Sequence, residues 1–312
     1  MESPLFLVGA ERSGTTLLRL MLEGHPQIAC PADFDFALDW PAHRPGEPRS
    51  VLDFWDRLSQ SRQARRHRVV IHGELDVPGL TRSLLAQLGA RTRKPIFGVT
   101  AHHHFARILA LWPDARFIYL LRDGRDVARS YVERGLAGNV WAAASVWREA
   151  EREWAQLCAR LPAERRIELR YEDLVRQPER VLARVCAFLD VDPTPEMLAF
   201  PARTRHEAPD PRLAERWREK LSHRELAWLE REIGSELRAR GYAESLVPAA
   251  WIPAPRRMAL RAGDRFGRAS FRLRRYGARL WAGHPLARRF RIARLAQLTA
   301  QRMQAIDAAV IR

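Results

Sequence analysis

The 312-residue sequence has little of what secreted and membrane proteins rely on. It contains only three cysteines, Cys30, Cys158 and Cys186, an odd number with no C-x-x-C spacing, so we expect reduced thiols rather than disulfides or zinc ligands. No apolar run approaches the ~18 residues that a membrane span requires. The chain runs directly into an apolar stretch without a basic leader, so we expect no secretion signal. These absences predict a cytoplasmic protein.

Lysine is also nearly absent, since only Lys94 and Lys220 are present and every other side-chain cation except histidine is arginine. The net charge of +16 is unevenly distributed. Residues 250–312 hold 15 arginines and 2 aspartates, roughly +13, which leaves only about +3 for residues 1–249. Prolines at 248, 253 and 255 mark the change. We predict a main domain over 1–247 and an arginine-rich helical extension over 248–312, with helices at 258–276 and 286–311.

The basic extension has two main interpretations. In the first it is a solvated helical tail that packs on the main domain or on a second copy of the chain. In the second it docks on an anionic surface, a membrane or a polyanionic partner, which predicts a protein peripheral to the membrane. We expect no specific nucleic-acid recognition, because the sequence contains no reader motif.

The main domain alternates short apolar runs with amphipathic segments. This alternation predicts an α/β fold with a parallel sheet covered by helices on both faces. Expected strands are 5–8, 28–30, 95–99, 116–121 and 165–170, and expected helices are 15–24, 51–66, 80–88, 102–111, 139–161, 178–189 and 221–240. Residues 41–50 are predicted to form a surface loop, and the proline-rich residues 190–220 a lid.

A glycine-containing turn follows the first strand. Gly9 and Gly14 nearly match the nucleotide-binding pattern G-x-x-x-x-G-K-[ST], but Thr15 occupies the lysine position. A turn of this kind before a helix N-terminus binds anions through backbone N–H groups and the helix dipole. Without the lysine, hydrolysis of a nucleoside triphosphate loses most of its support. The sequence therefore predicts a phosphate-binding loop that is not a typical ATPase loop.

A second polar turn follows the strand at 116–121, with Arg122 at its end and Ser130 eight residues later. A third segment, 170–175, precedes the helix at 178–189. In this order, over residues 4–245, the three segments resemble bacterial-type sulfotransferases that use 3′-phosphoadenylyl sulfate (PAPS), near the tyrosylprotein and carbohydrate branch. The resemblance implies a P-loop-like three-layer α/β/α fold with a mainly parallel sheet. It also implies transfer of a sulfuryl group from PAPS to a hydroxyl or amine, with 3′-phosphoadenosine 5′-phosphate (PAP) as product and no metal.

The resemblance also assigns the nucleotide site. It implies that the first loop holds the 5′-phosphosulfate, while Arg122 and Ser130 hold the 3′-phosphate. Tyr171 either lines the adenine or packs structurally, and Lys220 reaches the 3′-phosphate from the lid. Arg125 and Arg129 are expected to pair with Asp123 and Asp126 instead. The first-loop residues concerned are Arg12, Ser13, Gly14, Thr15 and Thr16, with Arg12 also placed as a catalytic cation.

The general base has several candidates. Asp33 matches the position at which several relatives carry glutamate, although aspartate is shorter by one methylene. Asp35 is expected on the same face of an extended strand. The run His102-His103-His104 offers a histidine base instead, most plausibly His102 or His104. A triple histidine also suggests a metal, but no acidic or cysteine partner lies near it in the sequence, so we expect no metal site.

Two other functions are open. One is a kinase-like phosphotransferase in which Asp123 anchors magnesium, and the other is a non-catalytic polyanion-binding protein. The acceptor of a sulfotransferase would be a small molecule, a glycan or a lipid. We expect the segments at 36–70 and 135–150 to shape its site.

Overall fold

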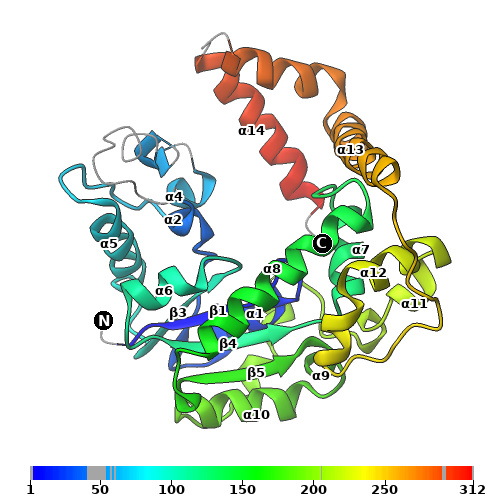
Figure 1. Cartoon of the computed structure of the whole chain (residues 1–312). Coiled ribbons are helices and arrows are strands. Elements are labelled where there is room, and N and C mark those ends of the chain that lie inside the picture. The colour runs from blue at the N-terminus through cyan, green and yellow to red at the C-terminus, as the bar shows by residue number, and fades with distance from the viewer. Residues whose placement is uncertain are drawn as a thin grey trace. The chain divides into compact units, whose positions relative to one another are not determined.

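The computed structural model describes residues 3–40, 54–56, 58–59, 61–204, 206–289 and 293–310 (Figure 1). The loop predicted at 41–50 and part of the helix predicted at 51–66 lie outside the described residues. The chain forms two compact units. The first comprises 1–122, 149–200 and 208–211, and the second comprises 123–148, 201–207 and 212–312. The predicted domain boundary at 247/248 stays a prediction.

The first unit contains a five-stranded sheet in the order β2-β3-β1-β4-β5, in which every neighbouring pair is parallel. All four residues of β1 are buried, as expected for a strand whose two faces are both covered. The predicted α/β fold is confirmed. The strands are β1 (Leu5–Val8), β2 (Ile28–Ala29), β3 (Ile96–Ala101), β4 (Arg116–Leu121) and β5 (Arg166–Arg170).

Helices cover both faces of this sheet and give three layers (Figure 1). On one face the β4 residue Tyr119 stacks on Trp154 with ring centroids 4.5 Å apart and meets the edge of Phe105 at 6.4 Å. These two partners come from α8 (Val140–Cys158) and α6 (Phe105–Leu111). The other face carries α1 (Thr15–Gly24), as the right-handed crossover that leaves β1 requires. It also carries α10 (Pro178–Leu189), which follows the last strand (Figure 1). The predicted three-layer arrangement is therefore confirmed.

The strand order places β1 between β3 and β4. The connection that leaves β1 covers one face of the sheet, whereas the connection after β3 covers the opposite face. Ligands of open α/β sheets bind where such connections diverge, beyond the carboxyl ends of the strands. The fold therefore predicts that a ligand binds among the segments that follow the carboxyl ends of the strands.

The other helical segments differ from the sequence prediction in their bounds, and several short ones were not predicted. The helix predicted at 102–111 begins only at Phe105, because His104 has a left-handed backbone with φ 62°. The other helical segments of the first unit are α2 (Asp35–Leu38), α4 (Arg62–Arg66), α5 (Val77–Gly89), η1 (Ala163–Arg165), α9 (Tyr171–Arg176) and η2 (Pro195–Met197). The short helix η4 (Pro211–Leu213) begins in this unit with Pro211 and ends in the second unit. Within the described residues, no helix is long and apolar enough to cross a membrane.

The second unit has a buried cation at its centre. Arg125 lies 2.7 Å from the Asp123 carboxylate and 3.2 Å from that of Glu230, and its guanidinium carbon lies 3.7 Å from the ring centroid of Trp217. Arg129 contacts Asp126 at 3.5 Å, so both predicted pairings are present. This unit contains α7 (Gly124–Glu133), the start of α8, η3 (Phe200–Arg203), α11 (Trp217–Lys220), α12 (His223–Ala239), α13 (Ala254–Arg289) and α14 (Ala293–Val310).

The C-terminal region is helical, as predicted. Its first helix breaks at Gly277, directly after the predicted end at residue 276, because Gly277 has a non-helical backbone with φ 74° and ψ 160°. The helix predicted to begin at residue 286 is divided, because α13 resumes after Gly277 and runs to Arg289, and α14 begins at Ala293. Phe266 and Met258 are 76% and 69% exposed on α13. The membrane and self-association roles of this region stay predictions.

Candidate active site

The turn after β1 is shaped to leave space above the N-terminus of α1. A Cβ atom on Gly9 would lie 2.6 Å from the carbonyl oxygen of Leu120, so only glycine fits there. Arg12 and Gly14 both have left-handed backbones, with φ of 74° and 98°. Helix α1 begins after Gly14 with no side-chain cap and no acidic residue in its first turn. Its first N–H groups have no partner within the helix, which makes this end a site for an anion.

A buried hydroxyl supports this interpretation. Ser13 is fully buried, and its Oγ has no hydrogen-bond partner among the described residues. The Ser13 backbone N–H donates to the carbonyl oxygen of Ala10 at 3.0 Å, which closes the turn beneath the helix end. A buried hydroxyl without a partner is costly unless a ligand or water satisfies it. The first loop therefore has a donor ready for a bound oxyanion.

The end of β4 meets this loop. The Nη1 of Arg122 donates to the carbonyl oxygen of Arg12 at 3.1 Å, and its guanidinium carbon lies 4.0 Å from the ring centroid of Tyr171. The Tyr171 ring in turn packs against Gly14. The segments after β1, β4 and β5 thus converge at one place. Sequence reasoning expected the first two to meet, and the structure brings them together.

The end of β3 reaches the same loop from the other side. Both oxygens of Asp35 accept from His102, one from the backbone N–H at 2.7 Å and the other from Nδ1 at 2.6 Å. The His102 Nε2 lies 3.0 Å from the hydroxyl of Thr15. Burial works against a charged ring, but the Asp35 carboxylate outweighs it and raises the pKa of His102 to about 9. Burial likewise opposes the Asp35 carboxylate, yet its interaction with His102 lowers the pKa of Asp35 below the usual value.

This Asp35–His102 pair was missed by the sequence analysis. Asp35 was expected on a strand facing the same way as Asp33, and that expectation was wrong because Asp35 is the first residue of α2. Asp35 and His102 are separated by 66 residues in the sequence. They pair because β2 and β3, which precede them, are neighbours in the sheet. The spacing along the chain carries no sign of such a contact.

Asp33 itself stands beside this pair. It forms an isolated parallel bridge with Thr100 near the end of β3. Its Oδ1 is buried and has no hydrogen-bond partner among the described residues. Its charge contributes to the raised pKa of His102, after burial and Asp35, which places the two side chains in the same surroundings.

Comparison with known proteins identifies this arrangement. The model of the sulfotransferase family matches residues 4–196, well over half of the chain. The chain belongs to the sulfotransferase family. The predicted family and the enzyme class are confirmed at this level, which favours them over the kinase-like and polyanion-binding alternatives.

Curated relatives of this sulfotransferase include animal enzymes. The protein-tyrosine sulfotransferase of Drosophila melanogaster is 26% identical over 215 residues, which cover 61% of this chain and 38% of the fly protein. Protein-tyrosine sulfotransferase 2 of Gallus gallus is 26% identical over 205 residues, which cover 61% of this chain and 52% of that protein. The sulfotransferase thus spans about half the length, or less, of these two relatives.

Solved structures agree on the fold. The sulfotransferase domain from the curacin biosynthetic pathway superposes with a TM-score of 0.57 at 21% identity, covering 78% of this chain and 99% of that domain. The sulfotransferase domain from the Synechococcus PCC 7002 olefin synthase gives a TM-score of 0.54 at 23% identity, and the match covers 74% of this chain and 95% of that domain. Their likeness shows that this sulfotransferase has the fold of those domains.

Two predicted nucleotide-binding residues belong to the second unit. Ser130 is the seventh residue of α7 and is buried, and Lys220 is the last residue of α11 and is exposed. Their roles stay predictions. In the first unit, Thr16 follows Thr15 in the first turn of α1 and is half-buried.

One premise about the triple histidine was wrong. The sequence shows no acidic residue near His103 and His104, but the structure brings Asp39 to both, with its Oδ1 2.7 Å from His103 Nε2 and 3.6 Å from His104 Nε2. Asp39 follows directly after α2, and the pairing of β2 with β3 carries it to the histidines.

Proposed function

We propose that this sulfotransferase transfers a sulfuryl group from PAPS to an acceptor hydroxyl, with residues 12–16 at the 5′-phosphosulfate and Arg122 at the 3′-phosphate. The observation that carries the proposal is the contact of the Arg122 guanidinium with the backbone of Arg12. Two arginines from different strand ends thereby flank one anion-binding loop. Arginine presents a planar fork of donors that matches phosphate oxygens.

The residues present fit this donor. The loop offers the Ser13 hydroxyl, which has no hydrogen-bond partner among the described residues, an uncapped helix end and no acidic side chain in the first turn of α1. The buried Tyr171 ring lies against both the Arg122 guanidinium and Gly14, so it supports the arginine and the loop that would hold the nucleotide. When bound, PAPS supplies the sulfuryl group that the acceptor oxygen takes in an in-line displacement. Such a transfer needs positioning and charge neutralisation more than covalent help from the protein.

The side chains that follow β2 and β3 take the positioning and proton-transfer roles in the proposed reaction. His102 is held at both nitrogens, by Asp35 and by Thr15, so it positions the loop hydroxyl. Asp33 has a buried carboxylate oxygen with no hydrogen-bond partner in the described part of the chain, so we assign it the role of the general base that accepts the proton of the acceptor hydroxyl. A general base of this kind contributes about 10²–10⁴-fold to a rate.

The acceptor class follows from the same assignment. A tyrosine hydroxyl has a pKa of about 10 and gives up its proton more easily than an aliphatic alcohol. The relatives named above are protein-tyrosine sulfotransferases. We therefore propose a phenolic hydroxyl as acceptor, with a tyrosine peptide as first candidate. Small alcohols, glycans and lipids form the comparison set of an acceptor screen with labelled PAPS.

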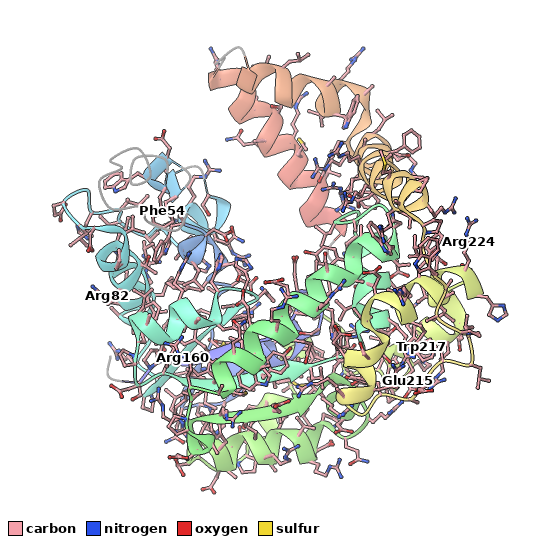
Figure 2. The ribbon with its side chains drawn as sticks, in the orientation of Figure 1. Phe54, Arg82, Arg160, Glu215, Trp217 and Arg224 are labelled. Atoms are coloured by element: carbon pink, nitrogen blue, oxygen red, sulfur yellow. The ribbon has the colours of Figure 1, made fainter. Side chains whose placement is uncertain are left out.

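The decisive experiment measures PAP binding by calorimetry without magnesium. Arg122→Ala removes charge-assisted hydrogen bonds worth about 1.5–3 kcal/mol each, so we expect at least about 10- to 150-fold weaker binding. The matched control is Arg82→Ala, because Arg82 is exposed on α5 (Figure 2), and it should bind PAP like the wild type. Asp33→Asn should keep PAP binding and lower kcat about 10²–10⁴-fold. Equal PAP affinity in the Arg122 and Arg82 variants, or magnesium-dependent ATP binding in place of PAP binding, contradicts the proposal.

A further inference from the structure

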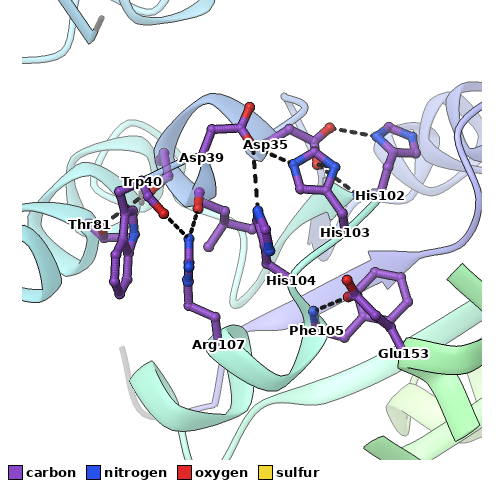
Figure 3. A network of polar contacts seen from close by, with 12 residues as sticks. Asp35, Asp39, Trp40, Thr81, His102, His103, His104, Phe105, Arg107 and Glu153 are labelled. Carbon is purple, nitrogen blue, oxygen red and sulfur yellow. Dashed lines mark hydrogen bonds and ion pairs between the residues drawn. The ribbon is translucent and has the colours of Figure 1, made fainter. Parts of the chain in front are cut away.

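We propose that Asp39, His103 and His104 form a binding site for one divalent transition-metal ion of the zinc type. The carboxylate comes from the residue after α2, and the two imidazoles come from the turn between β3 and α6 (Figure 3). All three belong to the first unit. They lie beside the Asp35–His102 pair but take no part in the proposed sulfuryl transfer, so this inference does not depend on that function.

The spacing of the three ligand atoms suits one ion. Zinc binds imidazole nitrogen and carboxylate oxygen at about 2.0–2.2 Å, so tetrahedral ligand atoms lie about 3.3 Å apart. The Asp39 Oδ1 is 2.7 Å from His103 Nε2 and 3.6 Å from His104 Nε2, which brackets this value. All three ligand atoms lie within 4.8 Å of one another. The two rings are nearly perpendicular, at 87°, so both edges can face a common point.

The backbone on both sides of the cluster is held in place. The Arg107 guanidinium donates to the carbonyl oxygens of Leu38 and Trp40, the two neighbours of Asp39, and its carbon stacks 3.7 Å from the centroid of the Trp40 ring. The carbonyl oxygen of His104 accepts the N–H of Arg107 at 3.0 Å at the start of α6. One arginine side chain and the helix that carries it thus fix the carboxylate and the second imidazole relative to each other.

Backbone strain marks the same position. His104 has φ 62° and ψ 37°, a left-handed conformation that only a few per cent of non-glycine residues adopt, with asparagine, aspartate and histidine the most frequent among them. Strain of this kind persists where the surroundings enforce it and is concentrated at ligand sites. Here it turns the His104 ring towards Asp39 rather than along the start of α6.

The donor set selects the metal class. Two imidazoles and one carboxylate suit zinc, cobalt or nickel, whereas magnesium and calcium prefer oxygen ligands. The side chains of His103, His104 and Asp39 are 36%, 37% and 54% exposed, so the ion is accessible and keeps open positions for water. Asp35 Oδ1 lies 3.8 Å from His103 Nδ1 and would orient that ring from behind. Binding would tie the end of α2 to the turn that carries His102.

The test uses the full-length chain after chelator treatment. Equilibrium dialysis against ZnCl₂, and the visible spectrum of added CoCl₂, measure affinity and ligand geometry. We expect one equivalent per chain and an intense, tetrahedral-type cobalt spectrum. Asp39→Asn and His104→Asn should each weaken zinc binding at least tenfold, and asparagine tolerates the left-handed backbone at position 104. The matched control is His72→Gln, because His72 contacts only one carboxylate, that of Glu74 at 3.3 Å, in the described residues.

The outcomes separate clearly. Saturable zinc binding that is lost in the two ligand variants and kept in the control supports the site. Absence of saturable binding, or equal affinity in all three variants, overturns it. PAP binding measured in chelator reports independently on the proposed sulfotransferase reaction, and a normal value in each ligand variant shows that the variant is folded.

Discussion

The contact between Gly14 and Tyr171 gives the sharpest test of how the loop is built. Gly14 has φ 98°, and a Cβ atom there would lie 2.6 Å from Cε2 of Tyr171 and still closer to Cδ2. Gly14→Ala therefore has two costs. The left-handed backbone costs an alanine about 1–2 kcal/mol, and overpacking against the ring adds about 1–3 kcal/mol. We expect Gly14→Ala to lower the free energy of unfolding by about 2–5 kcal/mol.

A double-mutant cycle separates these two costs. Tyr171 is 5% exposed, so Tyr171→Ala should itself cost about 3–5 kcal/mol, as other large-to-alanine changes do. In that background the added methyl meets no ring, and Gly14→Ala should cost only the backbone term of about 1–2 kcal/mol. The coupling between the two changes is then about 1–3 kcal/mol. Urea unfolding followed by circular dichroism measures all four variants.

The control for this cycle is Gly283→Ala. Gly283 lies in α13 with nothing within 4 Å of its would-be Cβ and no positive φ, so alanine there should be neutral or stabilising by up to about 1 kcal/mol. Additivity of Gly14→Ala and Tyr171→Ala within about 0.5 kcal/mol would mean that the ring does not press on the loop. Tyr171 would then have no part in shaping the anion site.

Two further predictions concern buried groups. Arg125→Met leaves the carboxylates of Asp123 and Glu230 without their shared cation, so unfolding free energy should fall by about 3–5 kcal/mol, and a loss below 1 kcal/mol in chemical denaturation contradicts this. Burial raises the pKa of the Cys30 thiol to about 12, and because only the thiolate is nucleophilic, iodoacetamide at pH 8 should leave Cys30 unmodified in the native protein while the less buried Cys158 reacts faster. Mass spectrometry of the labelled peptides checks this order, and rapid labelling of Cys30 refutes it.

Much of the first unit was predictable because its signals are local. The apolar runs at β1 and β4 are nearly all buried, and the glycines at 9 and 14 occupy positions where a side chain would clash. Arg122 was assigned to the end of its strand from the change of an apolar run to polar residues. These predictions needed only the rule that the carboxyl ends of parallel strands share one edge of the sheet.

Helix ends were less predictable. The helix predicted at 102–111 begins three residues late because His104 adopts a left-handed backbone, a conformation that the helical spacing of the segment does not reveal. The break after residue 276 was predictable, because Gly277 adopts a positive φ that glycine tolerates.

From its sequence alone, this chain could be read as an α/β protein with a lysine-less phosphate loop, an arginine at a second strand end and a basic C-terminal region. Those features depend on residue type and spacing, which a sequence records directly. Only the tertiary structure paired Asp35 with His102 and brought Asp39 to His103 and His104. The physical reason is that such pairs are set by strand order, and β2 lies beside β3 through contacts between segments separated by more than 60 residues.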